Sequence, residues 1–313
     1  MRIAIFGTGG AGGYFGALLA KAGNDVTFIA RGKHLAAMQS KGLVVETPAS
    51  LITIAPANAT SRPEDAGIVD LVLVGVKAWQ VTEAAEAMRP MVGPQTMVVP
   101  LQNGVEAAGQ LAAVLGAERV LSGLCGTFSR VSEPGRICNI GNINFIRFGE
   151  FDNRRSERIE RLLQLFAAAG ISAETPADIH QSLWMKFMAV TAFGGIGALS
   201  RAPIGVMRDI PETRRLLERC VEETFDLARE LGVGVADTAV GDTMGFFDKL
   251  TPGATTSLQR DIADGKPSEL DYWNGAVVRL ADGKGVEVQT HELIYDLLLP
   301  LERRARGTID FPA

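Results

Sequence analysis

The sequence predicts a two-domain protein, with a doubly wound α/β domain first and an all-helical domain second. Apolar runs typical of buried parallel strands alternate with helical patterns through the first half of the chain. A glycine-rich turn follows the first of these runs. Beyond Asp178 only helical patterns remain. We therefore assign residues 1–176 to the α/β domain and residues 177–313 to the helical domain, with the boundary in the turn 175–178.

Composition and charge narrow the class of protein. The chain has 313 residues, enough for about two domains, and 47% of them are hydrophobic, as in a globular enzyme. Its net charge of −5 argues against a nucleic-acid partner, because phosphate binding requires a basic surface. The three cysteines and three histidines show no metal-ligand spacing, so we expect no metal and a reducing cytoplasm. We expect no membrane segment, and interpret residues 187–199 as a buried helix followed by a break.

The first apolar run, Ile3–Phe6, leads into a G-x-G-x-x-G pattern that opens a helical stretch. In this strand-turn-helix context the pattern is the fingerprint of a dinucleotide-binding Rossmann domain. Gly7 would permit the tight turn, Gly9 would leave room for the pyrophosphate, and Gly12 would let the helix approach the strand. The helix N–H groups would then face the phosphates. The residues predicted to bind the cofactor here are Gly7, Gly9, Gly10, Ala11 and Gly12.

The end of the second predicted strand, Asp25–Ala30, indicates which dinucleotide is used. An enzyme that prefers NAD usually carries Asp or Glu there, to bind the ribose 2′-hydroxyl. This chain has Arg31 and Lys33 instead. A guanidinium can pair with a 2′-phosphate through two hydrogen bonds, so we predict NADP(H) as the cofactor, bound in part by Arg31. The alternative is an ordinary solvated loop.

Polar residues follow two further predicted strands, Val69–Val76 and Val98–Leu101. In open α/β sheets ligands bind at the carboxyl ends of the strands, so these residues are candidates for cofactor contact. Each could instead cap a helix. The candidates are Lys77, Gln80, Gln102 and Asn103.

The remaining elements follow from hydrophobic periodicity. In the first half we expect a small hairpin at 43–46 and 51–54, three strands at 120–124, 136–140 and 143–148 that extend the sheet, a helix at 156–169 and a last strand at 171–175. In the second half helices are predicted at 179–193, 203–207, 212–231, 257–263, 272–284 and 290–306.

A carbonyl that accepts a hydride from nicotinamide becomes an alkoxide and needs a proton donor. The three histidines, His34, His180 and His291, are poorly placed for that role. A lysine in apolar surroundings can serve, because desolvation makes an ammonium group release its proton more readily. Lys186 has aromatic and aliphatic neighbours throughout the segment 182–190 and is the candidate. The alternative is a lysine whose stem lies along the surface while its head reaches water.

Two further polar residues precede helical runs. Glu269 could cap the helix after it, bind substrate hydroxyls, or do both. Ser257 could be an N-cap or a hydrogen-bond donor to a ligand. Their spacing leaves these alternatives open.

Six segments spread over nearly the whole chain form a specific combination, although no single one is specific. They are Gly7-x-Gly9-x-x-Gly12-x-x-x-Gly16, Lys77-Ala78-Trp79-Gln80, Gln102-Asn103-Gly104, Leu183-Trp184-x-Lys186-Phe187, Ser257-x-x-x-Asp261 and Ser268-Glu269-Leu270-Asp271-Tyr272-x-Asn274-Gly275. In this order they resemble the ketopantoate reductase family, the NADPH-dependent 2-dehydropantoate 2-reductases. The resemblance implies a Rossmann domain followed by a helical domain like the C-terminal domain of phosphogluconate dehydrogenases, with the active site in the cleft between them.

The resemblance also implies roles for individual residues. Lys186 would be the general acid that protonates the new alkoxide. Glu269 would bind the terminal hydroxyl of the substrate and help hold Lys186. Asn103 would contact substrate and nicotinamide, and Ser257 would bind the substrate carboxylate. The residues implied at the cofactor phosphates are Arg31 and Lys77.

One departure from the family concerns the substrate. Family members commonly carry asparagines four and eight residues after the catalytic lysine, where this chain has Val190 and Gly194. We expect the family reaction, reduction of 2-dehydropantoate to (R)-pantoate in pantothenate and coenzyme A synthesis. The alternatives are the same chemistry on a different 2-keto acid and a sensor that holds NADP(H) without catalysis. The expected partner is thus a small keto acid, and a homodimer is compatible with the sequence.

Overall fold

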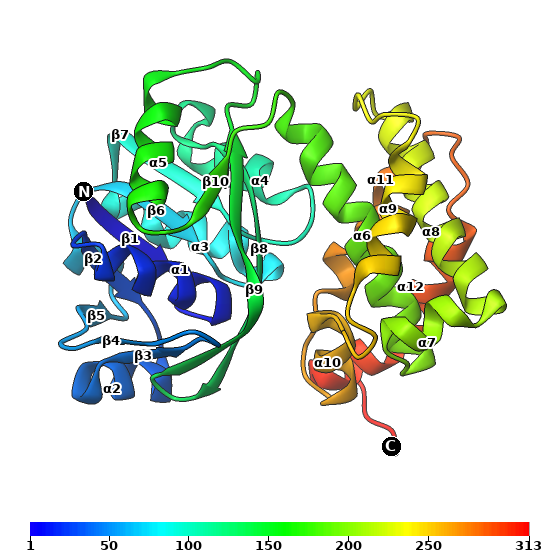
Figure 1. Cartoon of the computed structure of the whole chain (residues 1–313), viewed down its shortest axis with the longest axis horizontal. Coiled ribbons are helices and arrows are strands. Elements are labelled where there is room, and N and C mark those ends of the chain that lie inside the picture. Colours follow the sequence, from blue (N-terminus) through cyan, green and yellow to red (C-terminus); the bar gives the residue numbers. More distant parts are fainter. Residues whose placement is uncertain (313) are drawn as a thin grey trace. The chain divides into compact units, whose positions relative to one another are not determined.

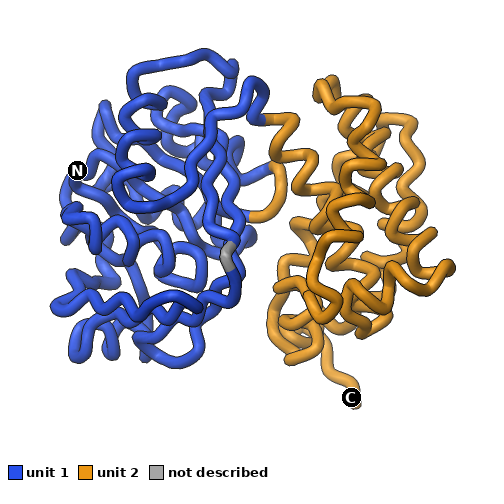
Figure 2. Tube along the Cα trace, in the orientation of Figure 1, with its two compact units in different colours: residues 1–102, 106–179 blue, residues 103–105, 180–313 orange. Residues whose placement is uncertain are grey.

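The computed structural model describes residues 1–312, except for the side chain of Asn142, and divides into two compact units (Figure 2). Unit 1 contains Met1–Gln102 and Glu106–Ile179. Unit 2 contains the short segment Asn103–Val105 and the chain from His180 onward. The chain therefore contributes to unit 2 twice, first with three residues and then with all residues from His180 onward.

Unit 1 is built around a five-stranded parallel sheet with the order β5-β2-β1-β6-β7 (Figure 1). The strands are β1 (Arg2–Phe6), β2 (Asp25–Ile29), β5 (Ala59–Thr60), β6 (Val69–Val74) and β7 (Val92–Pro100). The chain runs outward from β1 through β2 to β5, and then returns to the other side of β1 for β6 and β7. The carboxyl ends of β1 and β6 therefore form the topological switch point, where such sheets bind ligands. The predicted doubly wound domain is confirmed.

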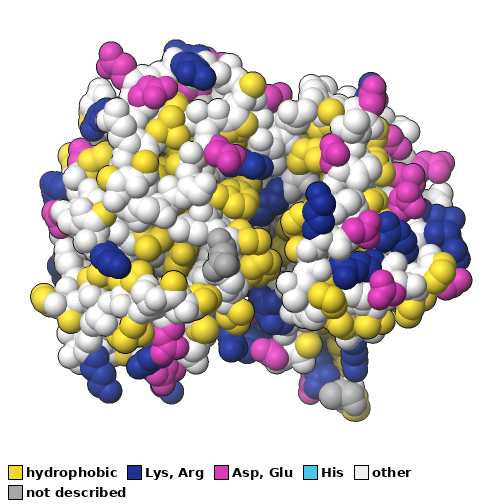
Figure 3. Space-filling model, viewed as in Figure 1, with side chains coloured by type: hydrophobic (Ala, Val, Ile, Leu, Met, Phe, Trp, Pro, Cys, Tyr) yellow, Lys and Arg dark blue, Asp and Glu magenta, His cyan; other side chains and the backbone are white. Residues whose placement is uncertain are grey.

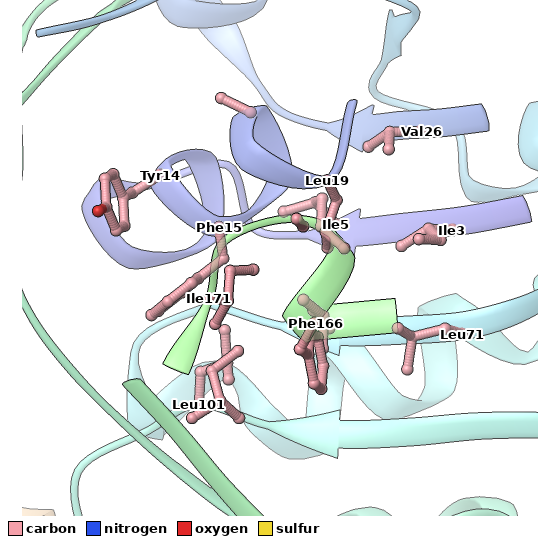
Figure 4. Packing of buried hydrophobic residues seen from close by; sticks show 14 of the residues in the cluster. Ile3, Ile5, Tyr14, Phe15, Leu19, Val26, Leu71, Leu101, Phe166 and Ile171 are labelled. Atoms are coloured by element: carbon pink, nitrogen blue, oxygen red, sulfur yellow. The ribbon is translucent and has the colours of Figure 1, made fainter. Parts of the chain in front are cut away.

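Alternate side chains of this sheet feed two separate cores. Ile5 packs in one core together with Phe15 and Phe166 from two helices (Figure 4), whereas Phe6 points into the other. Helices α1 (Gly10–Lys21) and α5 (Glu157–Ala168) contribute to the first core, and α3 (Val81–Met88) and α4 (Ala107–Leu115) contribute to the second. Covering both faces explains why the central strands are continuously apolar.

The strands predicted to extend the parallel sheet belong to a second sheet, so that prediction is wrong. The second sheet has the order β10-β9-β3-β4, with β8 paired to β9. Its strands are β3 (Leu43–Glu46), β4 (Leu51–Ile54), β8 (Ser122–Glu133), β9 (Arg136–Gly149) and β10 (Ser172–Glu174). Two long strands replace the three short ones because glycines inside them resemble turn signals. Gly126, for example, lies within β8, where an added Cβ would meet the ring of Phe145 at 2.1 Å.

In the described part of unit 2 every regular element is a helix, as predicted (Figure 1). The helices are α6 (Ile179–Ser200), α7 (Ile204–Asp209), α8 (Pro211–Glu230), α9 (Ala239–Lys249), α10 (Ser257–Ala263), α11 (Asn274–Ala281) and α12 (Gln289–Ala305), with a 3-10 turn η5 (Leu270–Tyr272) before α11. Elements that the sequence patterns missed include α2 (Gly32–Lys41), α4, α9 and strand β5. On the face shown in Figure 3, acidic and basic side chains are interspersed over each unit.

Helix α6 does not break after residue 193, which corrects the interpretation of residues 187–199. Its glycines are positions where neighbouring side chains approach the helix. A Cβ on Gly194 would lie 2.6 Å from the ring of Trp273, and one on Gly195 would lie 2.8 Å from the amide of Asn274. By length and composition α6 could cross a membrane, but 67% of its apolar window is buried in unit 2, the environment of a core helix.

Candidate functional site

The glycine turn after β1 combines close packing with an open position. Gly7 has a φ of +99°, and a Cβ there would lie 2.7 Å from Val76. A Cβ on Gly12 would lie 2.2 Å from the carbonyl oxygen of Gly7, so only glycine lets α1 approach so closely. At Gly9, in contrast, an added Cβ would meet only one atom, at 3.9 Å. The open space therefore lies beside the amino end of α1, where phosphate groups bind.

The other predicted residues of the turn have structural surroundings of their own. A Cβ on Gly10 would lie 2.2 Å from the carbonyl oxygen of Ser129, so β8 excludes a side chain at this position. Ala11 is half-buried. His34, in α2, accepts a hydrogen bond at Nδ1 from the N–H of Gly135 at 3.0 Å. Burial lowers the pKa of His34, so this histidine is a neutral packing residue.

Arg31 lies at the start of α2 rather than in a free loop. It occupies the N-cap position, and its guanidinium Nη2 is 3.8 Å from Oε1 of Glu83. Both side chains are about two-thirds exposed, at 66% and 70%. An exposed pair at this distance contributes at most about 1 kcal/mol, so Arg31 could leave Glu83 for a phosphate at little cost.

The polar residues after β6 and β7 divide into different roles. Gln80 accepts a hydrogen bond from the N–H of Lys77 at 3.4 Å, which supports the capping alternative for Gln80. Gln102 is 6% exposed and donates to the carbonyls of Val74 and Val76, both at 2.9 Å. Its amide thus ties the ends of two strands together. Lys77 is half-buried, with Nζ 5.8 Å from the ring centre of Trp79.

Four candidate residues for substrate chemistry lie in unit 2, although they come from separate segments. They are Asn103, Lys186, Ser257 and Glu269. The segment that carries Asn103 follows β7, yet Val105 packs against the core of unit 2. A Cβ on Gly104 would lie 3.4 Å from the carbonyl oxygen of Tyr272. The fold therefore brings an amide from the end of a Rossmann strand into the helical unit.

Lys186 is half-buried on α6, beside an aromatic pair. Trp184 and Phe187 meet edge to face with their ring centres 5.5 Å apart. Helical geometry places Val190 and Gly194 on the same side of α6 as the lysine.

The surface of α6 beyond Lys186 is apolar. Trp273, which is 1% exposed, covers Gly194 together with Leu258, whose side chain would lie 3.1 Å from an added Cβ. The indole Nε1 of Trp273 finds no hydrogen-bond partner among the described residues. The ring thus occupies the space that a side chain at position 194 would need.

The structure decides against the capping alternatives for Ser257 and Glu269. At α10 the N-cap is Thr256, whose Oγ1 accepts from the N–H of Gln259 at 3.1 Å, and Ser257 is the first helical residue. Glu269 makes no side-chain capping hydrogen bond at η5 in the described part of the chain. The residue is buried, with 6% of its surface exposed, and it stays a predicted substrate contact.

One residue of the matching segments has a structural role that the sequence did not reveal. Asn274 is fully buried, with its Nδ2 2.9 Å from Nδ1 of His291 and 3.3 Å from the carbonyl of Thr191. His291 in turn lies 2.9 Å from the carbonyl of Cys220 through Nε2. Burial lowers the pKa of His291 and keeps it neutral. These contacts join α6, α8 and α12 and leave no role for His291 in proton transfer.

Comparison with known proteins agrees with the fold described above. The family model described as Ketopantoate reductase PanE/ApbA matches residues 3–153, and its C-terminal counterpart matches residues 178–302. A 2-dehydropantoate 2-reductase of Mesorhizobium japonicum is 30% identical, over 97% of this chain and 97% of its own. The crystal structure of a PanE/ApbA family ketopantoate reductase from Ralstonia eutropha has a TM-score of 0.90 and 30% identity, covering 98% of this chain and 100% of that one. A D-mandelate dehydrogenase solved with NADH and anilino(oxo)acetate shares the fold, with a TM-score of 0.90 at 21% identity over 98% and 100% of the two chains.

The class of protein follows from these observations. A glycine turn at the switch point of a doubly wound sheet, followed by a helical unit with a half-buried lysine, defines a pyridine-nucleotide-dependent oxidoreductase of keto or hydroxy acids. The chain belongs to the ketopantoate reductase family.

Proposed function

We propose that this chain reduces a 2-keto acid with NADPH, and that 2-dehydropantoate, reduced to (R)-pantoate, is the first candidate substrate. The observation that supports the proposal is that Asn103, Lys186, Ser257 and Glu269 all belong to unit 2, although Asn103 is far from the other three in the sequence. A protein that only senses NADP(H) would not need an amide, an ammonium, a hydroxyl and a carboxylate in that unit. The family supports the choice of 2-dehydropantoate.

The residues of unit 2 divide the chemistry among them. NADPH, when bound, supplies the hydride that reduces the keto carbon. Lys186 donates the proton that neutralises the alkoxide oxygen. Asn103 and Ser257 orient the substrate through hydrogen bonds, Ser257 at the carboxylate. Glu269 binds a substrate hydroxyl and holds the ammonium group of Lys186.

The choice of NADPH over NADH rests on the end of β2. The residues that follow β2, 30–33, include no Asp or Glu to bind a ribose 2′-hydroxyl. Arg31 lies at the N-cap of α2 and has one weak, exposed partner, Glu83, among the described residues. A guanidinium in that position suits a 2′-phosphate. Gly9 and the amino end of α1 suit the pyrophosphate.

A second candidate is a different 2-keto acid with fewer hydroxyl groups. The observation that favours it is the apolar surface beyond Lys186, formed by Val190 and by Trp273 packed over Gly194. Such a surface offers no hydrogen bond to a substrate hydroxyl from that side of α6. Enzymes of this family work in pantothenate and coenzyme A synthesis, and we propose that role and a cytoplasmic location only together with the first candidate. A homodimer is likewise part of the proposal.

A panel of keto acids separates the candidates. The purified protein is mixed with NADPH and with 2-dehydropantoate, 2-oxoisovalerate, 4-methyl-2-oxopentanoate or phenylpyruvate, and NADPH absorbance is followed. A higher kcat/KM for 2-dehydropantoate than for the others supports the first candidate, and the reverse order supports the second. Tight NADPH binding without turnover of any keto acid would leave the sensor alternative.

A further inference from the structure

The backbone just before Glu269 is held by the side chains of Glu302, in α12, and Arg306, the C-cap residue of that helix. Ser268 and Glu302 are 0% and 1% exposed. The carboxylate oxygens of Glu302 accept from the N–H of Ser268 at 3.1 and 3.0 Å, and Oε2 also accepts from the Ser268 hydroxyl. Arg306 donates from Nε to Glu302 at 2.6 Å and from Nη2 to the carbonyl of Ser268 at 3.1 Å. We call Ser268, Glu302 and Arg306 the Ser268 clamp.

The backbone after Glu269 is held as firmly. The carbonyl oxygen of Glu269 accepts from the N–H groups of Tyr272 and Trp273, both at 3.0 Å. The N–H of Leu270 donates back to the hydroxyl of Ser268 at 3.3 Å. Hydrogen bonds therefore fix the peptide groups on both sides of Glu269, and its side chain starts from a backbone that cannot turn.

Stability alone does not explain this arrangement. Burying a carboxylate and a guanidinium is costly, and well-packed apolar residues would join two elements at least as well. Apolar residues could not bind the N–H, O–H and C=O of one residue at once. What the Ser268 clamp provides is the orientation of a single peptide, and Glu269 is attached to that peptide.

We propose that Glu302 and Arg306 are positioning residues that hold Glu269 in the orientation in which it binds the keto acid. This inference rests on the role given to Glu269 in the proposed function. Neither Glu302 nor Arg306 takes part in the reaction itself. They act on substrate binding through Ser268, from a helix more than thirty residues further along the chain.

The test uses Glu302→Gln, which keeps one oxygen for Ser268 but loses the charge that pairs with Arg306. We expect the KM for the keto acid to rise about tenfold, because the contact of Glu269 with the substrate is misplaced, and kcat to fall as well, because Glu269 also holds Lys186. The NADPH Kd stays unchanged, since the cofactor residues of the glycine turn belong to unit 1. Glu292→Gln is the matched control, because it removes the same charge from an exposed position of the same helix and should behave as wild type.

The outcomes separate positioning from folding and from the proposed function. A purely structural role would lower the unfolding temperature of Glu302→Gln and the fraction of protein that binds NADPH, at an unchanged KM, and would overturn the inference. If Glu302→Gln does not fold, the variants Ser268→Ala and Arg306→Lys test the inference instead. Wild-type KM values in both of these variants would also overturn the inference. Glu269→Gln tests the underlying role: an unchanged KM there refutes the role of Glu269, whereas a raised KM there with a normal KM in Glu302→Gln refutes only the clamp.

Discussion

Replacing Arg31 by Asp should reverse the cofactor preference, and the structure sets the size of the effect. Among the described residues Arg31 pairs with Glu83 alone, 3.8 Å away and well exposed, which is worth at most about 1 kcal/mol. Almost the full strength of a charge-assisted contact is then available to a 2′-phosphate. Such hydrogen bonds contribute about 1.5–3 kcal/mol each, so loss of the contact should cost NADPH about 3 kcal/mol, or roughly a hundredfold in Kd. NADH, which lacks the phosphate, should lose little.

The assay is a fluorescence titration of NADPH and NADH, which needs no knowledge of the substrate. Glu83→Gln is the control, because it frees Arg31 without removing it. It should tighten NADPH binding by no more than about fivefold, the equivalent of the exposed pair. If the ratio of the two Kd values in Arg31→Asp stays within threefold of wild type, Arg31 does not read the 2′-phosphate, and the NADPH assignment loses its basis.

Three further predictions concern catalysis, packing and pH. Lys186→Ala should lower kcat by at least about a hundredfold at an unchanged NADPH Kd, as measured in single-turnover experiments, and an unaltered kcat would remove Lys186 from the mechanism. Gly12→Ala places a methyl group 2.2 Å from the carbonyl of Gly7, so the free energy of unfolding in urea should fall by about 1–3 kcal/mol; an unchanged midpoint contradicts the packing of α1 on β1. Burial lowers the pKa of His34 and His291, so the unfolded chain takes up protons first and stability should fall as pH drops below about 6.5. Between pH 7.5 and 5.5 the loss should be smaller in His34→Gln, and an equal loss would show that His34 does not contribute.

Local patterns predicted the features of this chain that depend on neighbours in sequence. The glycine turn needs a strand before it and a helix after it, and both lie within twenty residues, so its fold could be predicted. The succession of apolar strands and helices predicts the doubly wound class of fold for the same reason. Lys186 stood out because its neighbours on α6 are apolar.

Local sequence patterns could not predict the contacts between segments that are far apart in the chain. The second sheet pairs β3 with β9, whose partner residues Val44 and Arg136 are far apart in the chain, and nothing in either segment names the other. The sequence leaves open whether Gln102 contacts the cofactor or has a structural role. Its hydrogen bonds to the carbonyl groups of Val74 and Val76 show the structural role. The glycines of α6 look like a helix break in the sequence, because the side chains that pack against them come from residues far along the chain.

The class of fold, the glycine turn and the family can be read from the amino-acid sequence, because they depend on short motifs and on the order of these motifs along the chain. Which polar residues have structural partners becomes visible only in the folded chain. Asn274 is joined to His291 in the core, Trp273 covers Gly194, and Glu302 holds the residue before Glu269. The physical reason is that a buried polar group must find its partner in three dimensions, and that partner can lie anywhere in the chain.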